Sequence, residues 1–382
     1  MYSRQDKIEK LIAELCSDGV EFKELCEIGR RNSGTSITAS RMKDLHYEGG
    51  PIKIFAGGNT VASVASDAVP AADIIYEPSI IVKSRGNIGF VYYDKPFSHK
   101  NELWSYTINS EAVDQKFVFY FLLTQTEKLQ KLARATSVKL PQLSIKDTDR
   151  LRIPLPPLAI QKEIVRVLDS FTELEAELEA ELEARKAQYG HYRETLLSSK
   201  EGFRRVILGD IATVGTGSHD TKDAVADGDY IFYARGRKPL RLNSFDFDET
   251  AIITAGDGVG VGNVFHFARG KYALHQRAYR IVPNEHVDVR FIYHYLVANF
   301  AQYLEQTSVH ASVTSLRRPM FLKCPISLPP LPEQVRIAGI LDKFDALVND
   351  IAVGLPAELV ARRKQYEYYR GKLLTFKEYA KS

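Results

Sequence analysis

The sequence predicts an α+β protein in which two similar α/β modules are separated by two long helices that pair as an antiparallel coiled coil. Three observations predict this fold. A proline- and leucine-rich segment occurs twice, a helical apolar stripe follows each copy, and the two remaining blocks mix short apolar segments with glycine-rich turns. The chain is therefore expected to have an approximate two-fold internal repeat.

The repeat is clearest in its proline-rich part. Residues 153–158 read Ile-Pro-Leu-Pro-Pro-Leu, and residues 326–331 read Ile-Ser-Leu-Pro-Pro-Leu, an offset of 173 positions. Further along, Tyr192 matches Tyr369, an offset of 177. The second copy is thus four residues longer than the first.

The first copy continues as a long helix. Its prolines exclude a helix at the entry, and apolar residues then recur three and four apart through a stretch rich in Glu, Leu and Ala. A helix over residues 160–198 would be roughly 58 Å long, and such a helix needs a partner stripe, which the second copy supplies. The residues expected to form the coiled coil and dock partners are Ile164, Leu168, Phe171, Leu174, Leu178, Leu182, Tyr189, Tyr192, Ile337, Leu341, Phe344, Tyr366 and Tyr369.

The second helix is expected to break near residues 354–356, where the sequence is Gly-Leu-Pro. Proline inside a helix removes a hydrogen bond and clashes with the preceding turn. Because four residues make about one helical turn, the stripes on either side of the insertion keep nearly the same face. We place the break between Val353 and Ala357 and expect the first helix to be continuous.

These boundaries divide the chain into four segments. The first module with a short N-terminal helix occupies residues 1–152, the first long helix 153–200, the second module 201–325 and the second long helix 326–382. The modules correspond in outline, as in the matching helical stripes that begin at Asp114 and Asp288 and the histidines His99 and His275. The repeat is cyclic, so the C-terminal end is expected beside the start of the first module, where Ile8, Leu11, Ile12 and Leu15 would pack.

Composition excludes several classes of protein. The chain has 382 residues, of which 45% are hydrophobic and 26% charged, with a net charge of +3, values typical of a globular protein and not of one that coats nucleic acid uniformly. By segment, residues 151–203 carry 7 basic and 10 acidic side chains (−3), and residues 204–323 carry 15 and 12 (+3). DNA contact would therefore belong to the modules rather than to the acidic helix, whose alternate glutamates from 173 to 183 are better explained as a solvated face than as a docking face.

Motifs of catalysis are missing from the sequence. It has no phosphate-binding loop, no methyltransferase Pro-Pro motif, no HExxH, no GxSxG and no nuclease carboxylate–lysine set. The glycine-rich run 256–262 has the wrong spacing for a cofactor loop and is better explained as a hairpin. Cys16, Cys26 and Cys324 are expected to be reduced, buried thiols, and nothing indicates a bound metal. Neither a signal peptide nor a membrane-spanning segment is predicted, so a cytoplasmic protein is expected.

Basic residues with recognition chemistry lie in the turns of both modules. Arginine forks suit guanine edges and phosphates alike, and lysines suit phosphates. The candidate DNA-binding residues are Lys83, Arg85, Lys100, Lys139, Arg235, Arg237, Lys238, Arg241, Arg277, Arg280, Arg317 and Arg318.

The whole chain resembles the specificity subunit of Type I restriction–modification systems, chiefly in its two proline-leucine-helix segments with their tyrosine-rich ends and paired leucines, and in its opening residues 6–29. The resemblance implies that the modules are target recognition domains, each reading half of a bipartite asymmetric sequence in double-stranded DNA. It implies that the coiled coil sets the spacer and docks two modification subunits, which methylate adenine, together with restriction subunits. S-adenosylmethionine, ATP and Mg²⁺ would then be bound by the partners and not by this chain.

One alternative class is open at this point. Two binding modules on a coiled-coil spacer would also suit an adaptor that binds protein or sugar, and the weak net charge favours this slightly, whereas the arginines in paired loops count against it. A self-contained nuclease or methyltransferase is disfavoured by the missing motifs.

Overall fold

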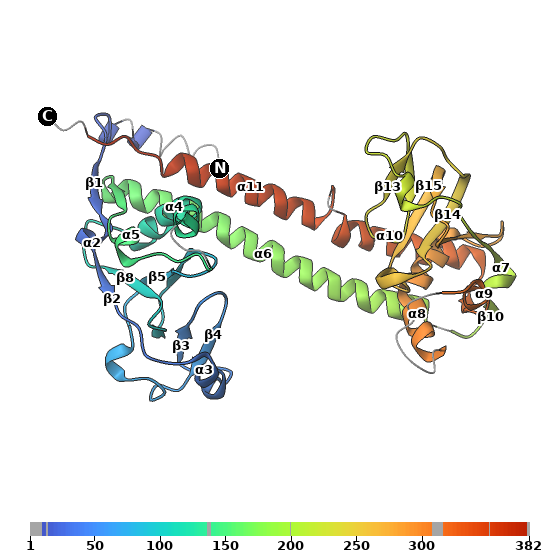
Figure 1. Cartoon of the computed structure of the whole chain (residues 1–382), viewed down its shortest axis with the longest axis horizontal. Coiled ribbons are helices and arrows are strands. Elements are labelled where there is room, and N and C mark those ends of the chain that lie inside the picture. Colours follow the sequence, from blue (N-terminus) through green and yellow to red (C-terminus); the bar gives the residue numbers. More distant parts are fainter. Residues whose placement is uncertain are drawn as a thin grey trace. The chain divides into compact units, whose positions relative to one another are not determined.

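The computed structural model describes residues 10–12, 14–135, 139–198, 200–307, 316–350 and 352–379. The chain forms two compact units (Figure 1). The first unit runs to Glu177 and takes up the chain again from Val360, and the second unit spans Leu178–Leu359. Among the described residues, no helix combines the length and apolar character needed to cross a membrane.

The first unit contains two small sheets and a separate antiparallel pair of strands. The pair joins β1 (Glu21–Glu24) to β9 (Arg152–Leu155). The four-stranded sheet has the order β2 (Gly29–Asn32), β8 (Trp104–Ile108), β5 (Ser79–Lys83), β6 (Gly89–Tyr93), and the three-stranded sheet has the order β4 (Val61–Val64), β3 (Ile52–Phe55), β7 (Phe97–His99). Its helices are α2 (Leu25–Ile28), α3 (Ala39–Leu45), η1 (Ala71–Asp73), α4 (Gln115–Ala135) and α5 (Ile145–Asp149).

The second unit repeats this plan with one larger sheet. Here β10 (Arg204–Ile207) pairs with β17 (Pro325–Leu328). The six-stranded sheet has the order β11 (Ala212–Thr216), β16 (Ala278–Pro283), β14 (Phe247–Ala255), β15 (Phe265–Leu274), β12 (Tyr230–Tyr233), β13 (Leu240–Leu242). Its helices are α7 (Leu208–Ile211), η2 (Thr221–Asp223), η3 (Gly258–Gly260), α8 (Val289–Thr307) and α9 (Arg318–Leu322).

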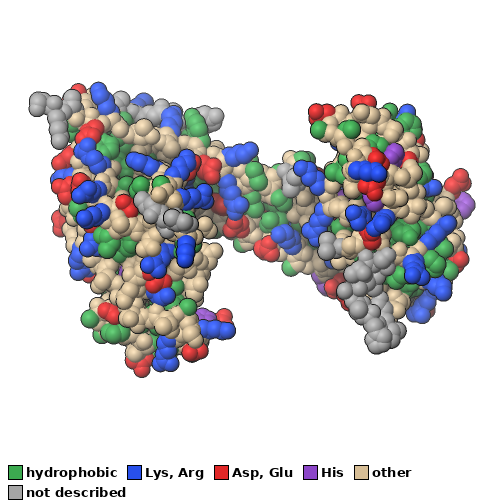
Figure 2. Space-filling model, in the orientation of Figure 1, with side chains coloured by type: hydrophobic (Ala, Val, Ile, Leu, Met, Phe, Trp, Pro, Cys, Tyr) green, Lys and Arg blue, Asp and Glu red, His purple; other side chains and the backbone are tan. Residues whose placement is uncertain are grey.

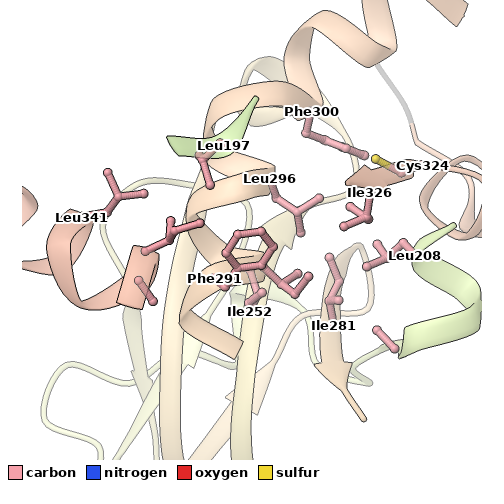
Figure 3. Packing of buried hydrophobic residues seen from close by; sticks show 14 of the residues in the cluster. Leu197, Leu208, Ile252, Ile281, Phe291, Leu296, Phe300, Cys324, Ile326 and Leu341 are labelled. Atoms are coloured by element: carbon pink, nitrogen blue, oxygen red, sulfur yellow. The ribbon is translucent and has the colours of Figure 1, made fainter. Parts of the chain in front are cut away.

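The predicted helical stripes of the modules are confirmed. In the first unit Phe117 and Leu122 of α4 are fully buried, and they pack in one core with strands β5 and β8 and with the first turns of the long helix. In the second unit Phe291 and Leu296 of α8 pack against Ile252 and Ile281 of the sheet (Figure 3). Each module is thus closed on one face by its own amphipathic helix.

The long helices are α6 (Leu158–Leu197), α10 (Leu331–Asn349) and α11 (Leu355–Leu373). Within the first unit, Phe171 of α6 stacks on Tyr369 of α11 with ring centroids 5.5 Å apart, and Glu175 binds Arg363 at 2.5 Å. Residue numbers rise along α6 while they fall along α11, so the predicted antiparallel pairing is confirmed there. Within the second unit, Tyr189 and Tyr192 of α6 stack on Phe344 of α10.

The first long helix is continuous over 40 residues, and the second is interrupted. The interruption follows Asn349 and ends at Leu355, so it lies just before Pro356 rather than around it. Pro356 is in the first turn of α11, where a proline loses no helical hydrogen bond. Gly354 is needed because a Cβ there would lie 2.4 Å from the carbonyl oxygen of Ala346.

The compact units divide the chain differently from the four predicted segments. Each unit unites a module with part of the helical pair, because one hydrophobic core continues from the module into the helices. The end of the chain returns to the first unit as predicted: the N–H of Val20 donates to the carbonyl of Lys377 at 2.8 Å. Leu11 and Ile12 pack on the core of that unit, whereas Ile8 lies outside the described residues.

Two expectations are wrong in detail. Cys26 is exposed, because Leu25 and Ile28 take the inward positions of the short helix α2, and Cys16 is only partly buried. The two histidines do not match in register. Lys100 and His275 donate their N–H groups to Phe55 and Tyr233, the equivalent strand ends, so His275 corresponds to Lys100 and not to His99.

Candidate nucleic-acid interface

Three loops of the second unit meet at Asp257. Asp257 follows β14, Arg235 follows β12, and Arg277 lies between β15 and β16. The Nη1 atoms of Arg235 and Arg277 each donate to a different carboxylate oxygen of Asp257, both at 3.0 Å. The carboxylate therefore joins two predicted DNA-binding arginines that are 42 positions apart in the sequence.

The glycines of the run 256–262 make this meeting possible. A Cβ on Gly256 would lie 2.6 Å from the carbonyl oxygen of Arg277, and one on Gly260 would lie 2.6 Å from that of Arg235. Gly258 has a φ of 78°, which favours glycine. The run is therefore glycine-rich because it passes directly against both arginine-bearing loops, which agrees with a bent backbone rather than a cofactor loop.

The electrostatics of this group favour a charged carboxylate and a neutral histidine. Burial raises the pKa of Asp257, but the hydrogen bonds from Arg235 and Arg277 outweigh it and the pKa lies below its usual value. Burial, assisted by the charge of Arg235, lowers the pKa of His275, whose Nδ1 accepts the backbone N–H of Arg277 at 2.9 Å. Two positive charges and one negative charge leave the group with a net positive charge.

A hollow of about 410 Å³ opens beside the group. Apart from Arg235 and Asp257, the residues that line it are Thr221, Ala234, Gly236, Lys238, Leu240, Gly258 and Gly260. Because four of these residues are glycine or alanine, a ligand edge can approach the backbone closely.

The other predicted residues of the second module fall into two groups. Arg237, Lys238, Arg317 and Arg318 are exposed. The N–H of Leu316 donates to the carbonyl of Gly256 at 2.7 Å, which brings Arg317 and Arg318 next to the glycine run. Arg241 instead donates to the backbone carbonyl of Gly228.

Arg280, like Arg241, is engaged in contacts within the chain. It binds Glu249 at 2.9 Å, and its guanidinium lies 4.3 Å from the ring centroid of Phe247. Its side chain is only 20% exposed. These contacts within the chain account for Arg280 without a ligand.

In the first module, Lys83, Arg85 and Lys139 lie near one another. Lys83 ends β5 and donates to Asn59 at 3.3 Å. Arg85 is exposed and pairs its backbone with Gln142, and the next residue, Gly86, donates to the carbonyl of Pro141, two residues beyond Lys139. Lys100 is elsewhere engaged, in an ion pair with Glu102 at 2.9 Å. Figure 2 shows basic and acidic side chains interspersed on the visible face of each module.

The carboxylates are what the sequence reasoning missed. The sequence predicts Asp257 only as part of a glycine-rich hairpin, whereas in the structure it binds two arginines. The signal available in the sequence was faint: an acidic residue between glycines, in a module whose other loops are rich in arginine and lysine.

Most residues predicted for the coiled coil pack the long helices against each other or against the modules. Those buried in the helical pair or its module cores are Ile164, Leu168, Phe171, Leu182, Tyr189, Ile337 and Leu341. Leu174, Leu178, Phe344, Tyr366 and Tyr369 are partly buried, and Tyr192 is 40% exposed although it stacks on Phe344. Docking of partners by these residues stays a prediction.

Comparison with known proteins identifies the class. A sequence model of the family described as "Type I restriction modification DNA specificity domain" matches residues 17–184 and again residues 200–361. The double match coincides with the internal repeat, so the chain contains two DNA specificity domains.

Individual relatives agree. The chain is 32% identical over 295 residues to the Type I restriction enzyme EcoR124I/EcoR124II specificity subunit of Escherichia coli, covering 68% of this chain and 70% of that one. It is 28% identical to the EcoprrI specificity subunit of Escherichia coli, over 90% of this chain and 91% of that one. The fold is similar to the crystal structure of the S subunit of a Type I restriction–modification system from M. genitalium, with a TM-score of 0.66, 18% identity and coverage of 93% and 96%.

The chain therefore belongs to the Type I restriction–modification DNA specificity family, and it is a DNA-recognition subunit rather than a catalytic one. Membership also makes it a component that assembles with other restriction–modification subunits on DNA. Because the chain belongs to this family, the alternative of an adaptor that binds protein or sugar is set aside.

Proposed function

We propose that each module reads a different half-site of a bipartite, asymmetric target in double-stranded DNA. The observation that carries this proposal is that two modules of the same topology present opposite charges at equivalent positions. Arg85 and Glu102 of the first module correspond by hydrogen-bond register to Asp257 and Arg277 of the second. Modules that share a scaffold but differ in charge at their loops suit two different base sequences.

The paired helices, in this proposal, set the number of base pairs between the half-sites and dock two modification subunits. Two recognition elements on a stiff connection select a fixed spacing. Support comes from the unbroken 40 residues of α6 and from the aromatic stacking of its two halves within their own units.

The chemistry would belong to the partners. The modification subunits would bind S-adenosylmethionine and methylate adenine, and restriction subunits would use ATP and Mg²⁺. The complex would work in the cytoplasm. The missing catalytic motifs support this division of labour.

The test is a methylome of cells that express this chain with its modification subunits. We expect one bipartite motif, and exchange of residues 1–152 for the same segment of another specificity subunit should change one half-site and leave the other. An unchanged motif after this exchange would refute the assignment of half-sites to modules.

A second experiment addresses spacing. Insertion of four residues, about one helical turn, between Glu175 and Ala184 should change the preferred spacer and preserve both half-sites. The measurement is again the methylated motif, with a four-residue substitution at the same place as the control. An unchanged spacer would contradict the role of α6 as a ruler.

A further inference from the structure

The group at Asp257 differs from an ordinary ion pair in its exposure. The side chain of Asp257 is 18% exposed, whereas those of Arg235 and Arg277 are 41% and 64% exposed. The carboxylate therefore lies beneath the two guanidinium groups, which face solvent.

The pair of Glu249 and Arg280 in the same sheet shows what a structural ion pair looks like here. Arg280 is 20% exposed and covered by Phe247, and Glu249 also accepts from the hydroxyl of Tyr272 at 2.7 Å. No ring covers Arg235 or Arg277 in the described part of the chain, and an exposed ion pair contributes little to stability. Stability alone is thus a weak reason for two exposed arginines on one carboxylate.

Each arginine keeps most of its donors. Only Nη1 is used by Asp257, and among the described residues neither guanidinium has another side-chain hydrogen bond. The Nε and Nη2 edge of each is left to make the two parallel hydrogen bonds that arginine forms with the O6 and N7 atoms of guanine.

The carboxylate of Asp257 would hold the two guanidinium groups in a fixed orientation. A free arginine side chain loses rotamer entropy when it is fixed, and a pre-formed ion pair removes part of this loss before DNA binds. The small residues lining the adjacent hollow, Ala234, Gly236, Gly258 and Gly260, leave room for a base edge beside Arg235.

We propose, on the basis of the function proposed above, that Asp257 is a positioning residue that presents Arg235 and Arg277 as the base-reading pair of the second module, and that this pair recognises guanine in the half-site of that module. The first module has the opposite charges, Arg85 and Glu102, at the positions of Asp257 and Arg277. The guanine contact is therefore specific to the second half-site.

The test uses the full chain in complex with its modification subunits. Duplexes randomised across the second half-site are methylated, and the preference for guanine at each position is read by sequencing. For D257N and for R277K we expect the preference for guanine to fall about tenfold at one or two positions, because the fork is disordered or lost. Preferences in the first half-site should stay unchanged.

The control is D248N, which removes the same charge from an exposed position on β14. It should keep every base preference, and thermal unfolding of each complex separates recognition from folding. R277K keeps the positive charge, so binding to DNA without a target should change less than twofold.

Three outcomes would overturn the proposal. In the first, the wild type selects no guanine in the second half-site. In the second, D257N and R277K keep all base preferences. In the third, D257N loses preference evenly at all positions of both half-sites. If the wild-type complex methylates no bipartite motif at all, the proposed function fails as well; if the motif is bipartite and only the variants behave unexpectedly, the positioning role alone fails.

Discussion

The two modules share one topology, but the strand pairing that is continuous in the second module is interrupted in the first. In the second unit β14 and β15 pair without interruption from Phe247–Tyr272 to Thr254–Phe265. In the first unit the equivalent hairpin divides into a bridge between Ile75 and Phe97 and the separate pair β5–β6. Pro78 and Pro96 lie in the gaps, and proline cannot donate to a strand ladder. Two prolines thus turn one six-stranded sheet into two smaller ones.

The attachment of each module to the long helices is shared more closely. In the first unit Lys116 and Tyr120 of α4 bind Asp169 of α6 at 2.8 and 2.6 Å. In the second unit Arg290 and His294 of α8 bind Asp342 of α10. The two attachments use equivalent positions but different side chains. The modules therefore share the position of the attachment, and their recognition loops are free to vary.

The largest expected effect comes from the core of each module. F117A and F291A each remove a fully buried ring and should destabilise their own unit by about 3–5 kcal/mol. Hydrogen exchange of the full chain, read over α4 and α8, measures each unit separately. Equal loss of protection in both units from either substitution would contradict two independent cores.

A smaller loss of stability is expected from replacing the buried glutamines, whose hydrogen bonds join each long helix to its module. Gln161 accepts from the N–H of Asp114 and donates to the carbonyls of Ala112 and Pro156, whereas Gln334 accepts from Asp288 and donates to Pro329. Q161L should cost about 2–3 kcal/mol and Q334L about 1–2 kcal/mol, since more groups lose a partner in the first unit.

Chemical denaturation of the full chain, followed by hydrogen exchange in each unit, would rank these two substitutions. The exposed neighbour Lys162 provides the control, because K162A should change stability by less than about 0.5 kcal/mol. A larger cost for Q334L than for Q161L would contradict the difference between the units.

The attachment of α8 to the long helix should respond to acid, because it uses His294 where the first unit has Tyr120. Burial lowers the pKa of His294, although Asp342 opposes this, and Nδ1 of His294 is buried without a partner among the described residues. The neutral ring therefore donates from Nε2 to Asp342. Because the unfolded chain binds more protons once the pH falls below the ordinary histidine pKa of about 6.5, stability of the second unit should decline there.

Hydrogen exchange over α8 and α4 at neutral pH and at about pH 5.5 would measure this decline. H294Y introduces the residue that the first unit has at the equivalent position, Tyr120, and should weaken the acid response of α8, while the contribution of His275, whose pKa is also lowered, stays. An acid response of α8 that is the same in H294Y as in the wild type would refute the role of His294.

The smallest expected effect concerns thiol reactivity and leaves the fold unchanged. Cys26 is exposed, while burial raises the pKa of Cys324 to about 12. An alkylating reagent at neutral pH should modify Cys26 well before Cys324, as measured by mass spectrometry of the folded chain. Equal rates would indicate that the second core opens readily.

The sequence by itself determined the internal repeat and its helices. Repeated prolines, the three- and four-residue spacing of apolar side chains and the stripes beginning at Asp114 and Asp288 are local signals, and they predicted α6, α4, α8 and the antiparallel pairing. The interruption of the second helix was also visible, although its place was set by Gly354, whose backbone packs against Ala346.

Only the tertiary structure decided which distant side chains meet. The one-residue difference between His99 and His275 became visible through strand register, and the joining of Arg235, Asp257 and Arg277 depended on three loops that the sheet brings together. Periodicity reports which face of an element is buried, but it carries no information about the partner across a sheet. Recognition residues therefore had to be found from contacts, whereas the frame that holds them could be read along the chain.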